Sequence, residues 1–396
     1  MLVAATALPL PTAADGVVTM TTGFHPDLHG LRGIAALSVL LFHWNYHFPQ
    51  WLPVADGSRG GLADALSLVA LRGWVGVPLF FVLAGYLLAA QLRTSDLTAP
   101  AILRFWVRRG LRIYPAYWLQ LAMLATLGAG FAAVPPLDGW ITVRDHVLLW
   151  LNLPPTMTRP LNGVWWTLPI ELGFYLLLPA LMLSCRRFGW LATYLFALLV
   201  SITWRAGVIA HLALDNYGVR ISVIDALPGS LAVFAAGMAA AHLTAPRSAA
   251  VRFGIVITAG VVLHVLLGSL EADIRGYWAG GWQLVILPSA IGIALALTLP
   301  CLIVPTPALD LLATRPMVVL GELSYGIYLW HFPVQRELRG LLPADWLAPW
   351  PLAGCLLIAL LATLALAWVS HRLIERPVMR WSHRRMGGQR DHDAPD

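Results

Sequence analysis

Long apolar runs, separated by short polar stretches, set the hydrophobic pattern of this chain. A helix needs about 20 apolar residues to cross the hydrocarbon core of a bilayer, and about ten runs reach or approach that length. They cover residues 31–48, 73–91, 116–134, 166–185, 188–207, 222–241, 253–270, 282–304, 317–334 and 351–370. The pattern therefore predicts an all-α integral membrane protein with about ten transmembrane helices.

A single folded domain is expected, because no internal repeat or Pro/Ser-rich linker divides these runs. We expect a disordered N-terminal tail over residues 1–22, a ten-helix membrane domain over residues 23–380 and a disordered cytoplasmic tail over residues 381–396. The apolar segment 145–153 is too short to cross a bilayer. We interpret it as a lumenal or re-entrant piece.

Composition narrows the class of protein. Apolar residues make up 59% of the chain and charged residues only 12%, whereas about 25% charged is usual for soluble domains. The 3 cysteines lie in apolar runs without ligand spacing, so neither a disulfide framework nor a metal site is expected. The net charge of +6 comes without basic runs that carry stacking aromatics, so no nucleic-acid partner is expected.

The arginines predict how the chain is oriented. Basic residues beside membrane helices stay preferentially on the cytoplasmic side. With the N-terminus inside and ten spans, most arginines fall on that side, although Arg336 and Arg339 lie in one outer loop. The distribution predicts cytoplasmic N- and C-termini and a multi-pass protein of the cell inner membrane, in contact with membrane lipids.

The first predicted span carries Arg32 near its start and His43 about three helical turns later, on the same helix face and about 16 Å away along the axis. Arginine is suited to binding phosphate, and histidine accepts a proton near neutral pH. Their separation matches the reach of a pantetheine arm between the phosphates and the thioester of a CoA. The alternative is a snorkelling arginine and a buried histidine that hydrogen-bonds a neighbouring helix.

A second basic group precedes the third span. Arg104, Arg108 and Arg112 share one face of a predicted interfacial helix, and Arg109 lies beside them. Such a face binds either anionic lipid headgroups or the phosphates of a nucleotide-bearing donor. Composition alone does not separate these two roles.

An acid inside a span costs about 2.5 kcal/mol or more at mid-membrane and marks a functional site by default. Glu171 is such an acid, and it either faces a polar cavity or pairs with an arginine or histidine of another helix. We also expect Trp166, Tyr175 and His331 to contribute to substrate binding, although a lone histidine is more often structural and tryptophans often line membrane interfaces.

Six stretches, in order, resemble membrane acyltransferase family 3, the group that contains bacterial O-antigen and exopolysaccharide acetylases and some macrolide acyltransferases. The stretches are residues 30–36 with His43, 80–86, 109–115, 166–175, 324–331 and 375–377. The sequence departs from the family at His29, where an acid is common, and at Ala84, where a serine is often found. Neither an acid at 29 nor a hydroxyl at 84 is therefore required here.

The resemblance implies that a cytoplasmic acyl-CoA supplies an acyl group to an extracytoplasmic sugar hydroxyl. The functional arginine–histidine pair of the family falls on Arg32 and His43, its Arg-x-x-Arg element on Arg109 and Arg112, and its acid on Glu171. Acetyl-CoA or another short acyl-CoA is then the donor, and a carbohydrate or glycosylated molecule is the acceptor.

Our hypothesis is an inner-membrane O-acyltransferase without a metal. Arg32, Arg109 and Arg112 would hold the CoA phosphates, and His43 would act as general base or carry the acyl group briefly. Glu171 would bind the acceptor or orient a histidine, either His43 or His331. The alternative is a multi-span permease or polysaccharide flippase, which intramembrane charges also fit, although inverted repeats typical of transporters are not evident.

Overall fold

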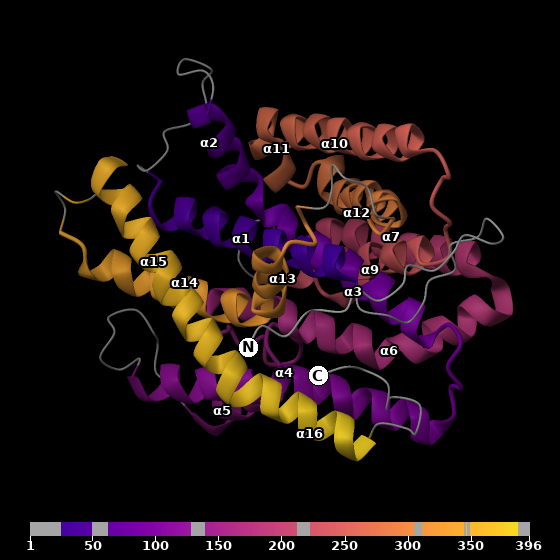
Figure 1. The fold of residues 1–396 in the computed structure, drawn as a ribbon, viewed down its shortest axis with the longest axis horizontal. Helices are drawn as coiled ribbons and strands as arrows, with labels where there is room; N and C mark the ends of the chain where they lie inside the picture. The colour runs from indigo at the N-terminus through magenta and orange to yellow at the C-terminus, as the bar shows by residue number, and fades with distance from the viewer. Residues whose placement is uncertain are drawn as a thin grey trace, which may run out of the picture.

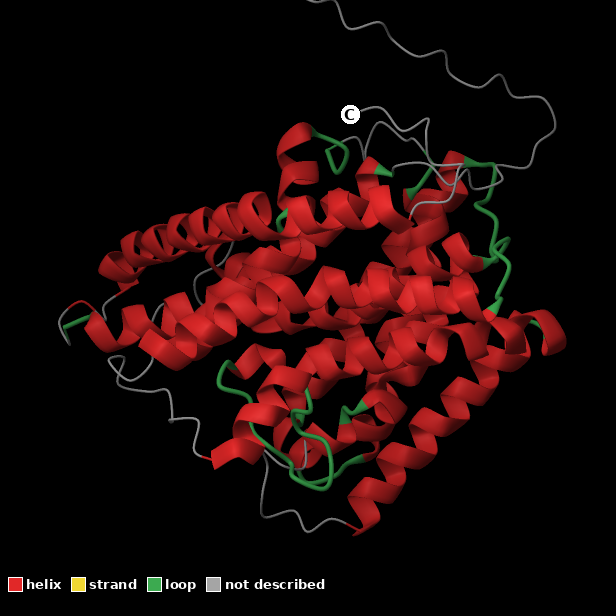
Figure 2. Cartoon of the chain, turned by 90° about the horizontal axis from the view of Figure 1, so that it is seen from below, coloured by secondary structure: helices red, strands yellow, loops and turns green. Residues whose placement is uncertain are grey.

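The computed structural model describes residues 25–49, 62–127, 139–211, 222–304, 311–343, 346 and 349–386. Every regular element in these ranges is helical, as Figure 2 shows. The all-α class predicted from the sequence is therefore confirmed. The predicted N-terminal tail, residues 1–22, lies outside the described residues.

Six helices in the described part of the chain are long and apolar enough to cross a membrane, which supports an integral membrane protein. They cover Ser67–Leu92, Gly163–Phe188, Trp190–His211, Ala249–Ala272, Trp282–Leu302 and Leu352–Met386. The predicted spans 31–48, 116–134, 222–241 and 317–334 are not among them. Helix length and hydropathy in the described residues thus do not reproduce the expected ten spans.

Three of these four spans do form helices, but these helices carry polar residues or are too short to count among the six long apolar helices. α1 (Pro26–His47) carries several histidines and Arg32. α4 (Ala99–Leu127) begins in the arginine-rich segment, and residues 128–138 after it lie outside the described residues. α9 (Leu227–Ala240) has only 14 residues.

The fourth, 317–334, was wrong as a single helix. α13 (Arg315–Glu322) ends and α14 (Ser324–Leu341) begins on either side of Leu323. The polar side chains of Glu322 and Ser324 interrupt the apolar run at this junction. The break places Ser324 at the start of a new helix, where it becomes part of the site described below.

Two helices form the centre of the array in Figure 1. α1 packs against α2 (Leu62–Arg72), α3 (Gly76–Leu92), α13 and α14. α9 packs against α3, α6 (Thr167–Phe188), α7 (Trp190–His211) and α12 (Trp282–Leu302). α3 therefore joins the two centres. The remaining elements are η1 (Gly73–Val75), α5 (Gly139–Leu148), η3 (Gly163–Trp166), α10 (Ala249–Ala272), α11 (Ile274–Trp278), α15 (Pro349–Ser370), η6 (His371–Glu375) and α16 (Arg376–Met386).

The contact between α3 and α9 requires glycine on both helices. A Cβ on Gly85 would lie 2.0 Å from the carbonyl oxygen of Phe234, and a Cβ on Gly237 would lie 2.0 Å from that of Val82. Small residues at such positions let the backbones of two membrane helices touch. A larger residue at either glycine would force α3 and α9 apart.

Prolines inside three helices create acceptors that link neighbouring helices. A helical proline has no N–H, so the carbonyl four residues earlier loses its usual partner, and in a membrane another group has to satisfy it. Pro179, Pro288 and Pro333 lie inside α6, α12 and α14. The freed carbonyl oxygens accept hydrogen bonds as follows: Tyr175 O from Trp106 (3.1 Å), Leu284 O from Arg205 (3.0 Å), and Leu329 O from Gln120 (2.7 Å) and Asn162 (3.0 Å).

The C-terminal helix corrects one boundary. Residues 381–386, expected to belong to a disordered tail, complete α16, which lies beside α4 in Figure 1. Ser382 is buried there, and Arg108 of α4 donates to the carbonyl oxygen of Met386. Packing against α4 keeps this segment helical.

Candidate active site

A cavity of about 100 Å³ lies between α1, α3, α4, α6 and α14. α3 gives it an apolar wall, and the other helices give it charged and hydroxyl groups. The polar residues that line it are Arg32, Arg109, Arg112, Thr167, Glu171, Tyr175, Ser324, Tyr325 and Tyr328. The three arginines and the acid predicted as site residues therefore meet in one place, although they come from three helices far apart in the sequence.

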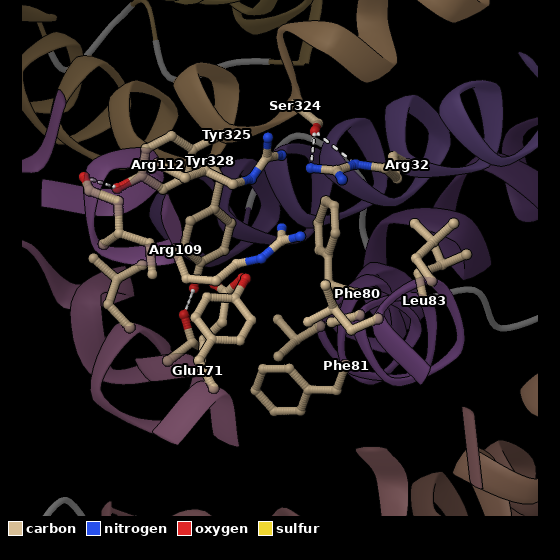
Figure 3. A pocket seen from close by; sticks show the side chains of 18 residues that line it. Arg32, Phe80, Phe81, Leu83, Arg109, Arg112, Glu171, Ser324, Tyr325 and Tyr328 are labelled. Atoms are coloured by element: carbon tan, nitrogen blue, oxygen red, sulfur yellow. Dashed lines mark hydrogen bonds between the residues drawn. The ribbon is translucent and has the colours of Figure 1, made fainter. Parts of the chain in front are cut away.

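Arg32 enters the cavity from α1. Its Nε and Nη2 donate to Ser324 Oγ over 3.4 and 3.3 Å, and Figure 3 shows these bonds at one edge of the cavity. Ser324 is fully buried. The predicted span 317–334, which is broken at Leu323, thus supplies a hydroxyl that orients the guanidinium of Arg32.

Arg109 and Arg112 enter from α4, and Figure 3 shows their guanidinium groups pointing toward the same space as that of Arg32. Arg109 donates to Gln91 Oε1 (2.9 Å) and lies over the rings of Phe105 (5.5 Å) and Tyr175 (5.8 Å). Burial is the main reason why the pKa of Arg109, which precedes the predicted span, lies below its ordinary value. Arginine nevertheless keeps its charge in proteins.

Glu171 lies on α6, where the hydroxyl of Tyr175 donates to its carboxylate from one turn away. In the described residues no guanidinium or histidine lies within ion-pair distance of Glu171. Its charge is thus available beside three guanidinium groups, and the cavity carries a net positive charge. A buried, positively charged cavity attracts anionic groups strongly, because the surrounding dielectric is low.

His43 lies further along α1 and does not line this cavity. Its Nδ1 is 3.0 Å from the carbonyl oxygen of Val39 and 3.1 Å from Nε2 of His331 on α14. Arg32 and His43 therefore both contact α14, in agreement with the prediction that they share a helix face. Neither histidine hydrogen-bonds Glu171 in the described part of the chain.

Tyr328 links the cavity to the histidine pair. It lines the cavity, and its ring centroid is 5.9 Å from that of His331. Its hydroxyl is 2.7 Å from Thr167 Oγ1 and donates to the carbonyl oxygen of Val164 over 2.7 Å. His331 thus contacts a residue that lines the charged cavity, and the histidine pair adjoins the cavity there.

The three predicted substrate-binding residues lie in different surroundings. Tyr175 lines the cavity, whereas His331 is fully buried behind Tyr328. Trp166 is half-buried in η3 and packs against the hydrophobic core without lining the cavity. The structure thus brings only Tyr175 of this group to the charged groups.

Sequence reasoning did not single out four of the lining residues, Thr167, Ser324, Tyr325 and Tyr328. Tyr325 donates to the carbonyl oxygen of Ile113 over 2.8 Å, which ties α14 to α4 next to Arg112. A sequence signal for them was present: three hydroxyl residues, at 324, 325 and 328, lie within one and a half helical turns of a largely apolar segment.

A larger hollow of about 920 Å³ adjoins the cavity. Arg109 lines both, so the two spaces share this side chain. We call the larger hollow the vestibule. Its charged lining residues are Asp96, Arg104, Arg108, Arg109 and Arg385. The vestibule is therefore a strongly basic space formed mainly by α4, the segment after α3 and the end of α16.

A family model described as an acyltransferase domain matches residues 25–372. The chain belongs to this acyltransferase family. Its similarity thus covers all the helices that form the cavity and the histidine pair.

Curated relatives include the peptidoglycan O-acetyltransferase OatA of Listeria monocytogenes, 24% identical over 90% of this chain and 56% of the relative. The O-acetyltransferase OatA of Staphylococcus aureus is 24% identical over 90% of this chain and 57% of its own. The acyltransferase MdmB of Streptomyces mycarofaciens is 27% identical over 91% and 93%. The chain spans just over half the length of the OatA relatives. No solved structure matches it.

Proposed function

We propose that this protein is an inner-membrane O-acyltransferase that moves an acetyl or short acyl group from cytoplasmic acyl-CoA to a hydroxyl of a carbohydrate or glycosylated acceptor. The observation that carries the proposal is the convergence of Arg32, Arg109 and Arg112 in a small buried cavity that adjoins a large basic vestibule. The family membership and the names of the OatA relatives support it.

The vestibule suits the nucleotide part of the donor. CoA carries several phosphates, and arginine binds phosphate oxygens through paired hydrogen bonds. Arg104, Arg108 and Arg385 offer such groups in the vestibule, and Arg109 offers one at its inner end. The pantetheine arm would then pass Arg109 and bring the thioester through the cavity toward His43.

The small cavity suits a short acyl group. An apolar cavity of about 150 Å³ holds a molecule the size of benzene, and this cavity measures about 100 Å³. Phe80 and Phe81 close it on the side of α3. A long fatty chain would not fit, so acetyl or a similarly short group is the proposed cargo.

The proposed topology has about ten spans with both chain ends in the cytoplasm. In that arrangement the start of α1 with Arg32, the arginine-rich start of α4 and the basic α16 lie at the cytoplasmic face, where acyl-CoA is found. Polar helices such as α1 count among the ten because their polar residues face the protein interior, as Arg32 and His43 do.

In the proposed chemistry, the acceptor O–H bond breaks and its proton passes to His43. The acceptor oxygen bonds to the thioester carbonyl carbon, the carbon–sulfur bond breaks, and the leaving thiolate takes the proton to give free CoA. His43 acts as this base or carries the acyl group briefly before the acceptor oxygen displaces it. Glu171 binds the acceptor, and Tyr175 and Trp166 contribute to that binding.

The test uses the purified full chain in proteoliposomes. Radiolabelled acetyl-CoA is supplied, with peptidoglycan oligomers or a simple glycoside as acceptor, and both free CoA and labelled acceptor are measured. We expect equal amounts of the two products, well above empty liposomes. If neither CoA release nor labelled acceptor is detected, the proposal is overturned. Transport of unmodified saccharide across the bilayer would favour the permease or flippase alternative.

A further inference from the structure

The hydrogen bonds around His43 define where its protons are. Nδ1 of His43 lies 3.0 Å from the carbonyl oxygen of Val39. A carbonyl oxygen only accepts hydrogen bonds, so this Nδ1 carries a hydrogen. The same argument applies to His331, because its Nδ1 lies 2.9 Å from the carbonyl oxygen of Ile327.

The remaining nitrogen of His331 then has one role available. With Nδ1 protonated, the neutral ring of His331 has a lone pair on Nε2. This atom lies 3.1 Å from Nδ1 of His43, whose hydrogen is therefore shared between Val39 O and His331 Nε2. The result is a directed chain in which His43 donates to His331 and His331 donates to Ile327.

This chain leaves Nε2 of His43 unprotonated. No described residue hydrogen-bonds to that atom, and His43 is half-buried whereas His331 is fully buried. In a neutral imidazole the partner of one nitrogen determines which nitrogen is basic. The lone pair needed by a general base, or by an acyl carrier, is thus directed away from His331.

Further contacts on both sides of the histidine pair join α1 and α14. Gln335, one turn after His331, donates to the carbonyl oxygen of Leu40 over 3.0 Å. Arg32 and Ser324 join the same two helices at their other end. The ring of Phe332 packs edge-on against His43, with centroids 5.2 Å apart. α1 and α14 therefore cannot slide past each other without breaking buried hydrogen bonds.

We propose that His331 is a positioning residue for His43. It fixes the tautomer of His43 that has its lone pair on Nε2, and it accepts a stronger hydrogen bond from Nδ1 when His43 takes up the proton of the acceptor hydroxyl. The inference rests on the proposed acyl transfer and assigns His331 a role other than contact with the acceptor. Both ring nitrogens of His331 already have partners within the protein.

The kinetic test compares two substitutions at one position. The amide oxygen of glutamine can occupy the place of Nε2, so His331→Gln keeps an acceptor, whereas His331→Leu has none. Partners that orient a functional histidine are typically worth about 10- to 100-fold. With radiolabelled acetyl-CoA in proteoliposomes, we expect His331→Leu to lower kcat by that factor with KM for acetyl-CoA unchanged, and His331→Gln to recover most of kcat.

Gln335→Leu is the matched control, because it removes a buried hydrogen bond between the same two helices without touching His43. We expect it to lower thermal stability while kcat stays near that of the wild type. An equal loss of kcat in Gln335→Leu, or in both His331 variants, would show that His331 only joins the helices. A raised acceptor KM with normal kcat in His331→Leu would show acceptor binding instead. Either result overturns the inference.

A measurement on the unmodified protein covers the case in which the leucine variant does not fold. Nitrogen NMR of protein with isotope-labelled histidine distinguishes the two neutral tautomers, and comparison with His43→Asn identifies the signals of His43. We expect the hydrogen on Nδ1; a hydrogen on Nε2 overturns the inference. Absence of acyl transfer by the wild-type protein would instead reject the proposed function, while this spectrum still reports on the hydrogen-bond chain.

Discussion

Arg32 donates to Ser324 Oγ through both Nε and Nη2, so the first residue of α14 orients the guanidinium that enters the cavity from α1. The bond joins residues separated by most of the chain. The oxygen of Ser324 serves as the acceptor for a cation. The relationship makes a specific prediction about donor binding.

Ser324→Ala should weaken the binding of acetyl-CoA while leaving the chemical step largely intact. A hydrogen bond to a charged group is worth about 1.5–3 kcal/mol, so KM for acetyl-CoA should rise by about tenfold or more as Arg32 loses its orientation. Steady-state kinetics in proteoliposomes measures this. Ser289→Ala is the control, because Ser289 is buried on α12 without a hydrogen-bond partner in the described residues. A matching change in both variants would speak against the specific role of Ser324.

Arg104→Gln and Arg108→Gln should reduce the preference of the enzyme for the complete nucleotide. If vestibule arginines bind the terminal phosphate of CoA, the wild type should show a KM for acetyl-dephospho-CoA about 10- to 100-fold above that for acetyl-CoA. The variants should bring the two KM values together. Arg187, exposed at the end of α6, supplies the control Arg187→Gln. Unchanged discrimination in both vestibule variants would place the phosphate elsewhere.

Glu171→Gln and Tyr175→Phe separate the carboxylate from the hydroxyl that donates to it. We expect Glu171→Gln to raise KM for the acceptor about tenfold or more, because acceptor hydroxyls lose a charged hydrogen-bond partner. Tyr175→Phe keeps the ring beside Arg109 and should change acceptor KM less. The control is Tyr194→Phe, since the Tyr194 hydroxyl has no partner in the described residues. An acceptor KM that stays constant in Glu171→Gln would remove this acid from acceptor binding.

Arg205→Met should destabilise the fold. Arg205 is buried, pairs with Asp225 and donates to the carbonyl oxygens of Gly229 and Leu284. Breaking a buried ion pair by removing one partner costs about 3–5 kcal/mol, which thermal unfolding in detergent would report as a lower Tm.

Pro288→Ala gives residue 288 an N–H for the carbonyl of Leu284, so it should recover part of that stability, about 1 kcal/mol, in the Arg205→Met background. In the wild-type background, where Arg205 already donates to this carbonyl, the gain should be smaller. Equal effects of Pro288→Ala in both backgrounds would contradict the idea that Arg205 replaces the missing donor.

The sequence predicted much of the site because the relevant spacing was local. Arg32 and His43 lie on one helix, and a helical period alone places both against the same neighbour. Arg109 and Arg112 likewise share a helix. The convergence of the two helices with Glu171 came from the family resemblance, since periodicity says nothing about which helices are neighbours.

The contribution of α14 could not be predicted in the same way. Its apolar run hides a break at Leu323, and only the fold shows that Ser324 then meets Arg32. The role of His331 depends on the orientation of two rings from different helices, which no linear pattern records. The six apolar helices of the described residues differ from the expected ten spans partly because α1 carries Arg32 and three histidines, which lower its hydropathy.

Most of the apolar wall of the cavity comes from one helix. α3 contributes Val77, Phe80, Phe81, Leu83, Ala84, Leu87 and Leu88, whereas every charge in the cavity comes from α1, α4 or α6. Under the proposed function, replacing side chains of α3 would therefore alter the length of acyl chain that fits without disturbing the arginines. Selectivity for the acyl group and affinity for CoA could in this way change independently as related enzymes evolve from one ancestor.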